Sequence, residues 1–249
     1  MRLLTAAGTA TDLDPAALRA LYRVEPGRRL LRASFLASAD GAVEHGGVSA
    51  GLGGPADREM IGMLRGLCDA ILVGAGTLRA ERYRPVRPRA DRRAARVADG
   101  LPEYPRLIVV SGALDLDPAW PVFTDAPVRT VVLTHGGSDP ARRDALAPVA
   151  DVLVHGLDRV DLRAAMTDLR DRYAATHLLC EGGPMLLGVL RAAGLVDELC
   201  LTVAPLMAGP GAGRIIAGPA GPEHPDRMRL AHVIEVDGYL MLRYVRVGA

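Results

Sequence analysis

The chain of 249 residues has no lysine, asparagine or glutamine, so all 30 of its basic residues are arginine. The absence of lysine excludes P-loop nucleotidases and protein kinases, whose lysine binds phosphate, and pyridoxal-phosphate enzymes, whose lysine forms a Schiff base. Aromatic residues make up only 4% and the formal net charge is +1. We therefore expect no nucleic acid partner, because few bases could stack and no excess positive charge is present.

Cysteine is also scarce. The three cysteines, Cys68, Cys180 and Cys200, are odd in number and lie in apolar runs, which is typical of reduced core thiols in a cytoplasmic protein. The sequence has no C-x-x-C, and no H-x-E followed by P-C-x-x-C. We therefore expect no bound metal and no zinc deaminase site.

Long hydrophobic runs are missing as well. No uncharged apolar run approaches the roughly 18 residues of a membrane span, so we expect no membrane partner and no signal peptide. The length fits one domain, residues 1–249. Residues 1–28 are expected to form an N-terminal helical extension, with a helix over 14–23 that has Asp14 as its N-cap and Pro15 at its first position.

Short apolar runs alternate with helical patterns along most of the chain. Apolar runs of about four to eight residues between helices are typical of parallel strands that helices cover on both faces. We expect strands at 31–37, 70–74, 107–111, 130–134, 151–156, 177–182 and 198–207, and helices near 56–67, 140–147, 161–173 and 184–193.

The end of the chain has a different pattern. Two strand patterns, 229–236 and 239–247, flank Asp237-Gly238, and Asp-Gly between strands is a strong hairpin signal. The expected fold class is therefore α/β, with a mixed, mostly parallel sheet, helices on both faces and a C-terminal antiparallel hairpin. Residues 79–96, which carry eight arginines, are expected to form a proline-containing loop.

Two glycine-rich turns follow predicted strands. The first is AILVGAGT at 70–77, and the second is LLCEGGP at 178–184, which leads into a helix. Glycines let phosphate oxygens approach backbone N–H groups, and the positive end of the helix dipole adds to the attraction. Arg79 breaks a strict G-x-G-x-x-G pattern, so the first turn alone also fits a tight turn without a ligand. Two such turns at the carboxyl ends of parallel strands favour one shared nucleotide cleft.

Five motifs occur in a specific order: ASADG at 37–41, GGPADR at 53–58, LRGLCDAILVGAGT at 64–77, EGGP at 181–184 and GLVDEL at 194–199. Together they resemble the reductase domain of riboflavin-biosynthesis pyrimidine deaminase/reductases. The resemblance extends over residues 31 to about 247, nearly the whole chain.

The resemblance implies a three-layer fold similar to dihydrofolate reductase, a homodimer, and reduction of a ribosylaminopyrimidine by NADPH. A small heterocycle is therefore the expected substrate. The deaminase half of the bifunctional enzymes is missing here, which agrees with the lack of a zinc motif. The chain would be a stand-alone reductase.

The resemblance also implies site residues. Together with the glycine turns and the strand end at Ser111, it gives these cofactor-binding candidates: Gly74, Gly76, Thr77, Ser111, Gly182, Gly183, Pro184, Met185 and Leu186. The implied substrate-binding residues are Ser49, Arg65, Glu181 and, with a one-residue shift of the motif, Arg87.

The implied reaction needs a proton in addition to the hydride, and a partly buried carboxylic acid suits that role. The candidates are Asp40, Glu81 and Glu181. Each has another interpretation: an Asp-Gly turn at Asp40, a solvated loop at Glu81, and a charge at a helix N-terminus for Glu181.

Other basic residues follow predicted strands. The arginines of 79–96 could bind the substrate phosphate or the 2′-phosphate of NADPH, because guanidinium groups bind phosphate bidentately. Such runs are more often solvated, so we expect at most two of them to contact ligand. For His135 a structural role is favoured over a ligand contact.

The chain departs from the family pattern at two places. Where the family continues D-D-P-x-L-T-x-R, this chain has ERYRPVR at 81–87, and Gly51 replaces a usual aromatic residue. Two alternatives therefore stay open: a reductase of dihydrofolate or another pteridine, and a nucleotide-binding protein without catalysis.

Overall fold

The computed structural model describes residues 1–4, 10–25, 27–218 and 224–248. The strands are β1 (Arg2–Leu4), β2 (Ala10–Asp12), β3 (Leu30–Ser38), β4 (Ala70–Gly74), β5 (Arg106–Val110), β6 (Thr130–Thr134), β7 (Ala150–Val154), β8 (His177–Cys180), β9 (Glu198–Ala204), β10 (Met228–Val236) and β11 (Tyr239–Arg246). The helices are α1 (Pro15–Tyr22), α2 (Pro55–Arg65), α3 (Ala75–Ala80), α4 (Ala90–Ala98), α5 (Pro121–Thr124), α6 (Pro140–Leu146), α7 (Leu162–Tyr173) and α8 (Pro184–Ala192), with a 3-10 turn, η1, at Ser49–Gly51.

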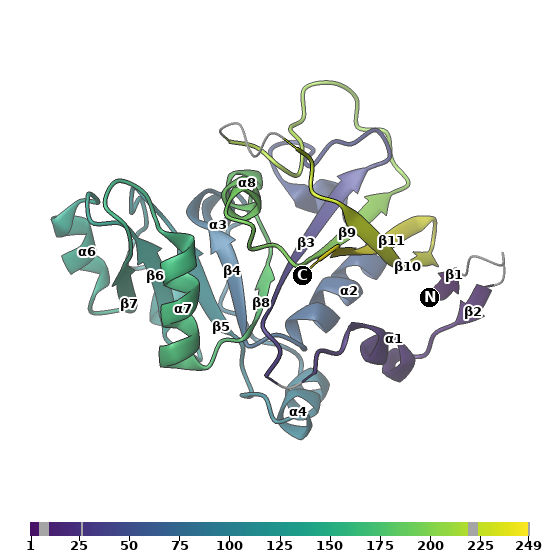
Figure 1. Ribbon diagram of the computed structural model, residues 1–249, viewed down its shortest axis with the longest axis horizontal. Helices are drawn as coiled ribbons and strands as arrows, with labels where there is room; N and C mark the ends of the chain where they lie inside the picture. Colours follow the sequence, from purple (N-terminus) through teal and green to yellow (C-terminus); the bar gives the residue numbers. More distant parts are fainter. Residues whose placement is uncertain (5–9, 26, 219–223, 249) are drawn as a thin grey trace.

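All the strands belong to one mixed sheet (Figure 1), in the order β2-β1-β10-β11-β9-β3-β8-β4-β5-β6-β7. The part from β9 to β7 is parallel, and the part from β9 to β2 is antiparallel. The expected fold class is therefore confirmed: α/β, mostly parallel, with an antiparallel hairpin at the end of the chain.

The central strands are apolar because helices cover both of their faces. Along β4, Ile71 and Val73 pack into one core cluster with residues of α2, α3 and α5. The alternate residues, Ala70 and Leu72, pack into a second cluster with α7 and α8. This alternation follows from the two-residue period of a strand, and it produces the three layers.

The C-terminal hairpin turns at the predicted Asp237-Gly238 pair. Both residues have positive φ, +50° and +79°, which matches the tight hairpin turns that suit the twist of the strands. The turn joins β10 to β11, and β11 also pairs with β9. The hairpin thereby connects the parallel half of the sheet to β1 and β2.

The N-terminal region contains more than the helix expected over residues 1–28. The α1 helix begins as predicted: the Asp14 carboxylate accepts a hydrogen bond from the Ala17 amide at 2.7 Å, and Pro15 follows. The short strands β1 and β2 are additional, and β1 pairs with β10. A purely helical extension is therefore wrong, because this segment lengthens the sheet.

Two other boundaries differ from expectation. Residues 79–96 are not a single loop, because α3 ends within them and α4 begins at Ala90. The sequence of α4, ADRRAARVA, consists mostly of good helix formers, which explains the helix. The strand β9 ends at Ala204 instead of residue 207, because Pro205 has no N–H group to continue the ladder.

A buried charge network lies where the parallel and antiparallel parts of the sheet meet. The Glu198 carboxylate accepts hydrogen bonds from Arg32 at 2.8 Å and from Arg243 at 2.5 Å. The side chains of Arg32 and Glu198 are 0% and 1% exposed. Both guanidinium groups bind this one carboxylate, which offsets part of the cost of burying the three charges.

Candidate active site

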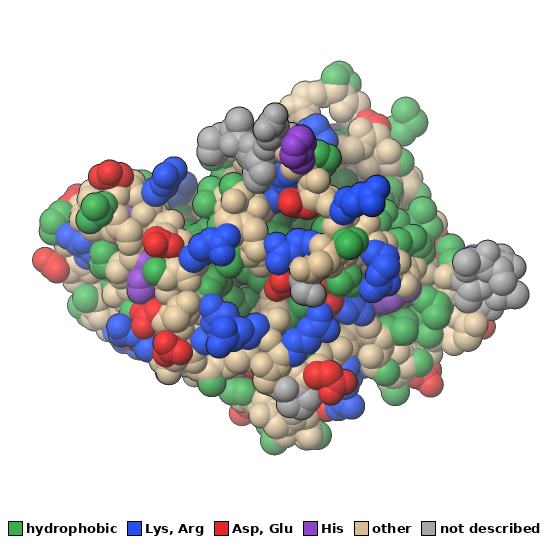
Figure 2. Space-filling view, viewed as in Figure 1, with side chains coloured by type: hydrophobic (Ala, Val, Ile, Leu, Met, Phe, Trp, Pro, Cys, Tyr) green, Lys and Arg blue, Asp and Glu red, His purple; other side chains and the backbone are tan. Residues whose placement is uncertain are grey.

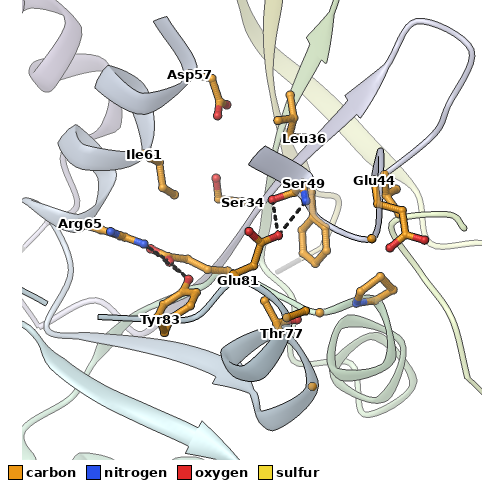
Figure 3. Close-up of a pocket in the computed structure, with 18 residues that line it drawn as sticks. Ser34, Leu36, Glu44, Ser49, Asp57, Ile61, Arg65, Thr77, Glu81 and Tyr83 are labelled. Atoms are coloured by element: carbon orange, nitrogen blue, oxygen red, sulfur yellow. Dashed lines mark hydrogen bonds and ion pairs between the residues drawn. The ribbon is translucent and has the colours of Figure 1, made fainter. Parts of the chain in front are cut away.

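A cavity of about 340 Å³ opens at the carboxyl ends of β3, β4 and β8 (Figure 3). Its size is in the range of small-molecule sites. Its lining consists of Ser34, Phe35, Leu36, Val43, Glu44, Gly47, Ser49, Asp57, Ile61, Arg65, Gly76, Thr77, Ala80, Glu81, Tyr83, Glu181, Gly183 and Pro184. Segments that are far apart in the chain thus meet where an open α/β sheet typically binds its ligand.

The two glycine turns touch each other at this cavity, as the sequence predicted. The Gly74 amide donates a hydrogen bond to the Gly182 carbonyl oxygen at 2.7 Å. A Cβ atom built on Gly183 would lie 2.4 Å from the Thr77 hydroxyl oxygen, so this position has no room for a side chain. Gly182 has a φ of +100°, which favours glycine. A Cβ on Gly76 would meet nothing within 4 Å, so the backbone there faces open space.

The second glycine turn leads directly into the N-terminus of α8. Gly183 is the N-cap residue and provides no side-chain hydrogen bond to the first turn of the helix, and Pro184 follows it. The amides of Met185 and Leu186 belong to this first turn, which suits an anion such as a diphosphate. Their side chains do not line the cavity: Met185 is 58% exposed and Leu186 is in the core. Only the backbone N–H groups of Met185 and Leu186 are therefore placed to bind a ligand in the cavity.

An ion pair crosses the cavity between α2 and the end of β8. Arg65 donates to both oxygens of Glu181, at 2.7 and 2.6 Å, and the Tyr83 hydroxyl also donates to this carboxylate. The Glu181 side chain is 5% exposed and that of Arg65 is 33% exposed. The Glu181 charge raises the pKa of the Arg65 guanidinium, and burial raises the pKa of Tyr83. Arg65 thus stays charged and keeps a surface toward the cavity.

A second carboxylate, Glu81, lies beside the first glycine turn. Its Oε1 accepts hydrogen bonds from the Ser49 amide at 2.7 Å and from the Ser49 hydroxyl at 2.8 Å. Figure 3 shows these two contacts across the cavity from Arg65. Ser49, Arg65, Glu81 and Glu181, all candidates from the sequence, are therefore brought together.

Several cavity residues were not among the sequence candidates, and three of them have ionisable side chains: Glu44, Asp57 and Tyr83. Asp57 precedes Ile61 and Arg65 by four and eight residues in α2, so all three lie on one helix face. That spacing from Arg65 was the available signal for Asp57. Tyr83 lies in the segment that departs from the family pattern, where no motif marked it.

Asp40 lies outside the cavity lining. Its carboxylate accepts hydrogen bonds from the Ser38 hydroxyl and from the amides of Ala208 and Gly209, at 3.1 and 2.9 Å. The Ser38 hydroxyl and these amides lower the pKa of Asp40 to about 2. An aspartate held in this ionised state on the surface anchors a loop and is poorly suited to donate a proton.

Three other candidates also make contacts outside the cavity. Arg87 is bound to Asp125, at 2.8 Å. The buried Ser111 hydroxyl, at the end of β5, accepts a hydrogen bond from the Leu114 amide at 3.0 Å. The His135 ring contacts the Leu157 carbonyl oxygen at 3.1 Å. A ligand contact by Ser111 or Arg87 remains a prediction.

The arginines of residues 79–96 mostly bind other parts of the protein. Arg92 and Arg93 form ion pairs with Glu59 and Glu103. Arg96 is buried and donates to backbone carbonyl groups, including those of Arg65 and Cys68. None of the eight lines the cavity described above.

A smaller hollow of about 200 Å³ lies at the opposite, amino ends of β3 and β8. Arg29, Arg170, Gly194 and Asp197 are among its lining residues, and neither of the two glycine turns at residues 74–77 and 181–184 reaches it. Figure 2 shows numerous basic side chains with acidic ones among them on the face that carries α7 and α8.

Two general features concern the described residues alone. No helix in the described ranges is long and apolar enough to cross a membrane. Within the same ranges, no group of three or more His, Cys, Asp or Glu side chains is arranged to hold a metal ion.

Known proteins resemble this chain in both sequence and structure. A family model described as the RibD C-terminal domain matches residues 29–242, which include the whole cavity lining. The 2,5-diamino-6-ribosylamino-4(3H)-pyrimidinone 5′-phosphate reductase of Methanothermobacter thermautotrophicus is 32% identical over 193 residues, which cover 77% of this chain and 85% of that protein. The reductase of the same name from Archaeoglobus fulgidus is 30% identical over 153 residues, 61% of this chain and 69% of the relative.

A solved structure shares most of the fold. A pyrimidine reductase-like protein from Corynebacterium diphtheriae superposes with a TM-score of 0.84 and 26% identity. The match covers 93% of this chain and 99% of that one.

Proposed function

The chain belongs to the RibD C-terminal domain family, and from this membership we propose that it is an NADPH-dependent reductase of a ribosylaminopyrimidine 5′-phosphate in riboflavin biosynthesis. The fold is the dihydrofolate-reductase-like one that the motifs implied. The observation that carries the proposal is the contact of Gly74 with Gly182, which unites two glycine turns at one cavity that also holds Arg65, Glu81 and Glu181.

The glycine side of the cavity would hold the nicotinamide cofactor. The open backbone at Gly76 and the uncapped first turn of α8 suit a diphosphate, and the absence of a Cβ at Gly183 lets the Thr77 side chain pack against this turn. Thr77 lies next to Gly183 and would contact the same ligand. When bound, NADPH supplies a hydride for the ribose C1′ carbon of the substrate.

The opposite side of the cavity would hold the substrate. Arg65 keeps N–H groups and positive charge facing the cavity, and Glu181 fixes its orientation through two hydrogen bonds. A positioned guanidinium binds an anionic or carbonyl group with little loss of side-chain entropy. We assign Glu181 to positioning Arg65, because Arg65 and Tyr83 already donate to its oxygens.

Glu81 is then the proposed proton donor. Its Oε1 is held by Ser49, while Oε2 makes no hydrogen bond to the described part of the chain. Reduction of the C1′–N imine adds hydride to carbon and a proton to nitrogen. A carboxyl group fixed on one oxygen and free on the other can deliver that proton.

The proposal is tested by two measurements on the purified protein. NADPH fluorescence should report binding at micromolar cofactor, and NADPH absorbance should fall when the ribosylaminopyrimidine 5′-phosphate is added. The same absorbance assay with dihydrofolate in place of the pyrimidine compound tests the alternative that the protein reduces a pteridine. Faster turnover of dihydrofolate, or no cofactor binding by folded protein, would falsify the proposal.

We also propose that residues 1–249 form one domain and that two chains form a homodimer. The continuous sheet supports one domain. Exposed apolar side chains on the terminal hairpin, Leu230 at 45% and Leu240 at 37%, together with Met207 at 87%, support association. Sedimentation at micromolar concentration should give the mass of two chains, and the mass of one chain would contradict the dimer.

A further inference from the structure

The Asp57 carboxyl group faces the cavity but has no part in the reaction outlined above. It lies in the first turn of α2, on the same helix face as Ile61 and Arg65. Figure 3 shows it pointing from α2 toward Ser34, with Ile61 and Leu36 on either side in this view. A carboxylate between two apolar side chains can accept hydrogen bonds from N–H groups on the edge of a flat ring and so select rings that carry them.

Asp57 differs from two of the other carboxylates that line the cavity, Glu81 and Glu181. Glu81 is bound by Ser49 and Glu181 by Arg65, at 2.6 to 2.8 Å. Asp57 forms none of the ion pairs found in the described ranges. The Thr202 hydroxyl and the Arg58 guanidinium favour its charged form, but burial outweighs them and raises its pKa. Such a group gains strongly from a ligand that donates hydrogen bonds to it.

We propose that Asp57 recognises the pyrimidine ring and selects a 2-amino-4-oxo ring over a 2,4-dioxo ring. This inference rests on the proposed function and narrows its substrate class. The amino group at C2 and the N3–H group present two donors side by side, which match the two oxygens of a carboxylate as a guanidinium does. A uracil ring presents an oxygen at C2, which would face a carboxylate oxygen with no proton between them.

The position of Asp57 leaves room for the rest of the substrate. Asp57 and Arg65 are eight residues apart on one helix, which separates them by about 12 Å along its axis. A ring bound at Asp57 therefore leaves Arg65 and Glu81 available to the ribose and phosphate. The apolar walls formed by Leu36 and Ile61 exclude water and strengthen the hydrogen bonds at the ring.

The test compares two substrates that differ only at C2: the 2,5-diaminopyrimidinone ribosylamino 5′-phosphate and its uracil counterpart. Wild type should show a kcat/KM at least about 100-fold higher for the amino compound, since a buried acceptor that loses its donor penalises the wrong ligand. Asp57→Asn offers one donor and one acceptor, so this ratio should fall at least about tenfold. The NADPH affinity should not change.

Asp91→Asn is the matched control, because Asp91 is also a first-turn aspartate, on α4 and outside the cavity. Its substrate ratio should equal that of wild type, whatever it does to helix stability. A wild-type preference for uracil, or the same ratio in Asp57→Asn, overturns the inference and leaves the reductase proposal standing. If neither compound is reduced, the reductase proposal fails. In that case the affinities of the protein for the two compounds are measured by calorimetry. Equal affinities overturn the inference that Asp57 selects the ring.

Discussion

The Gly74 amide lies 2.7 Å from the Gly182 carbonyl oxygen and donates a hydrogen bond to it. This bond joins the last residue of β4 to the segment that follows β8, and so continues the pairing of the two strands. The two glycine turns therefore form one backbone surface. A substitution in either turn should change the affinity for a ligand that contacts the other.

Gly183→Ala should weaken NADPH binding by about tenfold or more, equivalent to about 1.4 kcal/mol. The new Cβ would lie 2.4 Å from the Thr77 hydroxyl oxygen, so one of the two must move. Thr77→Ala removes that oxygen. In a double-mutant cycle followed by NADPH fluorescence, the loss of binding free energy in the double variant should be smaller than the sum of the losses in the two single variants. Losses that add up would contradict the clash.

Glu181→Gln should lower kcat by about 100-fold and leave the NADPH dissociation constant nearly unchanged. Glutamine keeps the shape of the side chain but cannot accept both Arg65 bonds as a carboxylate. Steady-state kinetics and cofactor titration separate the two effects. Glu103→Gln, which removes the partner of Arg93 at the surface, is the control. Unchanged kcat in Glu181→Gln would remove Glu181 from the mechanism.

Asp40→Asn should change kcat/KM by no more than about twofold, the scale of a surface substitution. Its carboxylate holds the Ala208 and Gly209 amides, so limited proteolysis near these residues should become faster. Since the pKa of Asp40 is lowered from 3.8 to about 2, its stabilising effect exists above pH 3.8 and disappears toward pH 2. Wild type and variant should converge in stability over that range. A large loss of kcat would instead assign Asp40 to the reaction.

His177 should make the protein less stable in mild acid. Burial, aided by the Arg32 charge, lowers the pKa of His177 from 6.5 to about 3. Below pH 6.5 the unfolded chain binds a proton that the folded chain does not, so the free energy of unfolding falls by about 2 kcal/mol on reaching about pH 5. Urea unfolding of His177→Gln should show a smaller decline than wild type, because only His232, whose pKa burial lowers from 6.5 to about 4, still contributes. The exposed His224→Gln should show the full wild-type decline, and an identical slope in all three proteins would exclude His177 as a cause.

Local chemistry explains which elements could be predicted. The hairpin turn requires two positive φ angles, and Asp237-Gly238 can supply them within two residues. The α1 helix begins with its cap and proline adjacent in sequence. The strand β1 could not be predicted, because its three residues become a strand only by pairing with β10 at the other end of the chain.

In the site, too, features set by neighbouring residues could be predicted, and features that need contacts between distant parts of the chain could not. Glycine turns and strand ends are visible in the sequence, and the shared cleft follows from parallel pairing. The Asp-Gly turn at Asp40 was visible, but the amides it binds come from the distant Ala208 and Gly209. Asp57 carried a usable signal, its helical spacing from Arg65, whereas the contact of Tyr83 with Glu181 depends on tertiary structure alone.

The buried network of Arg32, Glu198 and Arg243 restricts how this protein can change over time. Neutralising Glu198 alone would leave two guanidinium groups without their shared carboxylate, and losing either arginine would take hydrogen bonds away from that buried carboxylate. Each single substitution should cost about 3–5 kcal/mol, while a joint apolar replacement of similar volume can be tolerated. The three positions should therefore be inherited as a set, so that descendants carry either the full triad or none of it.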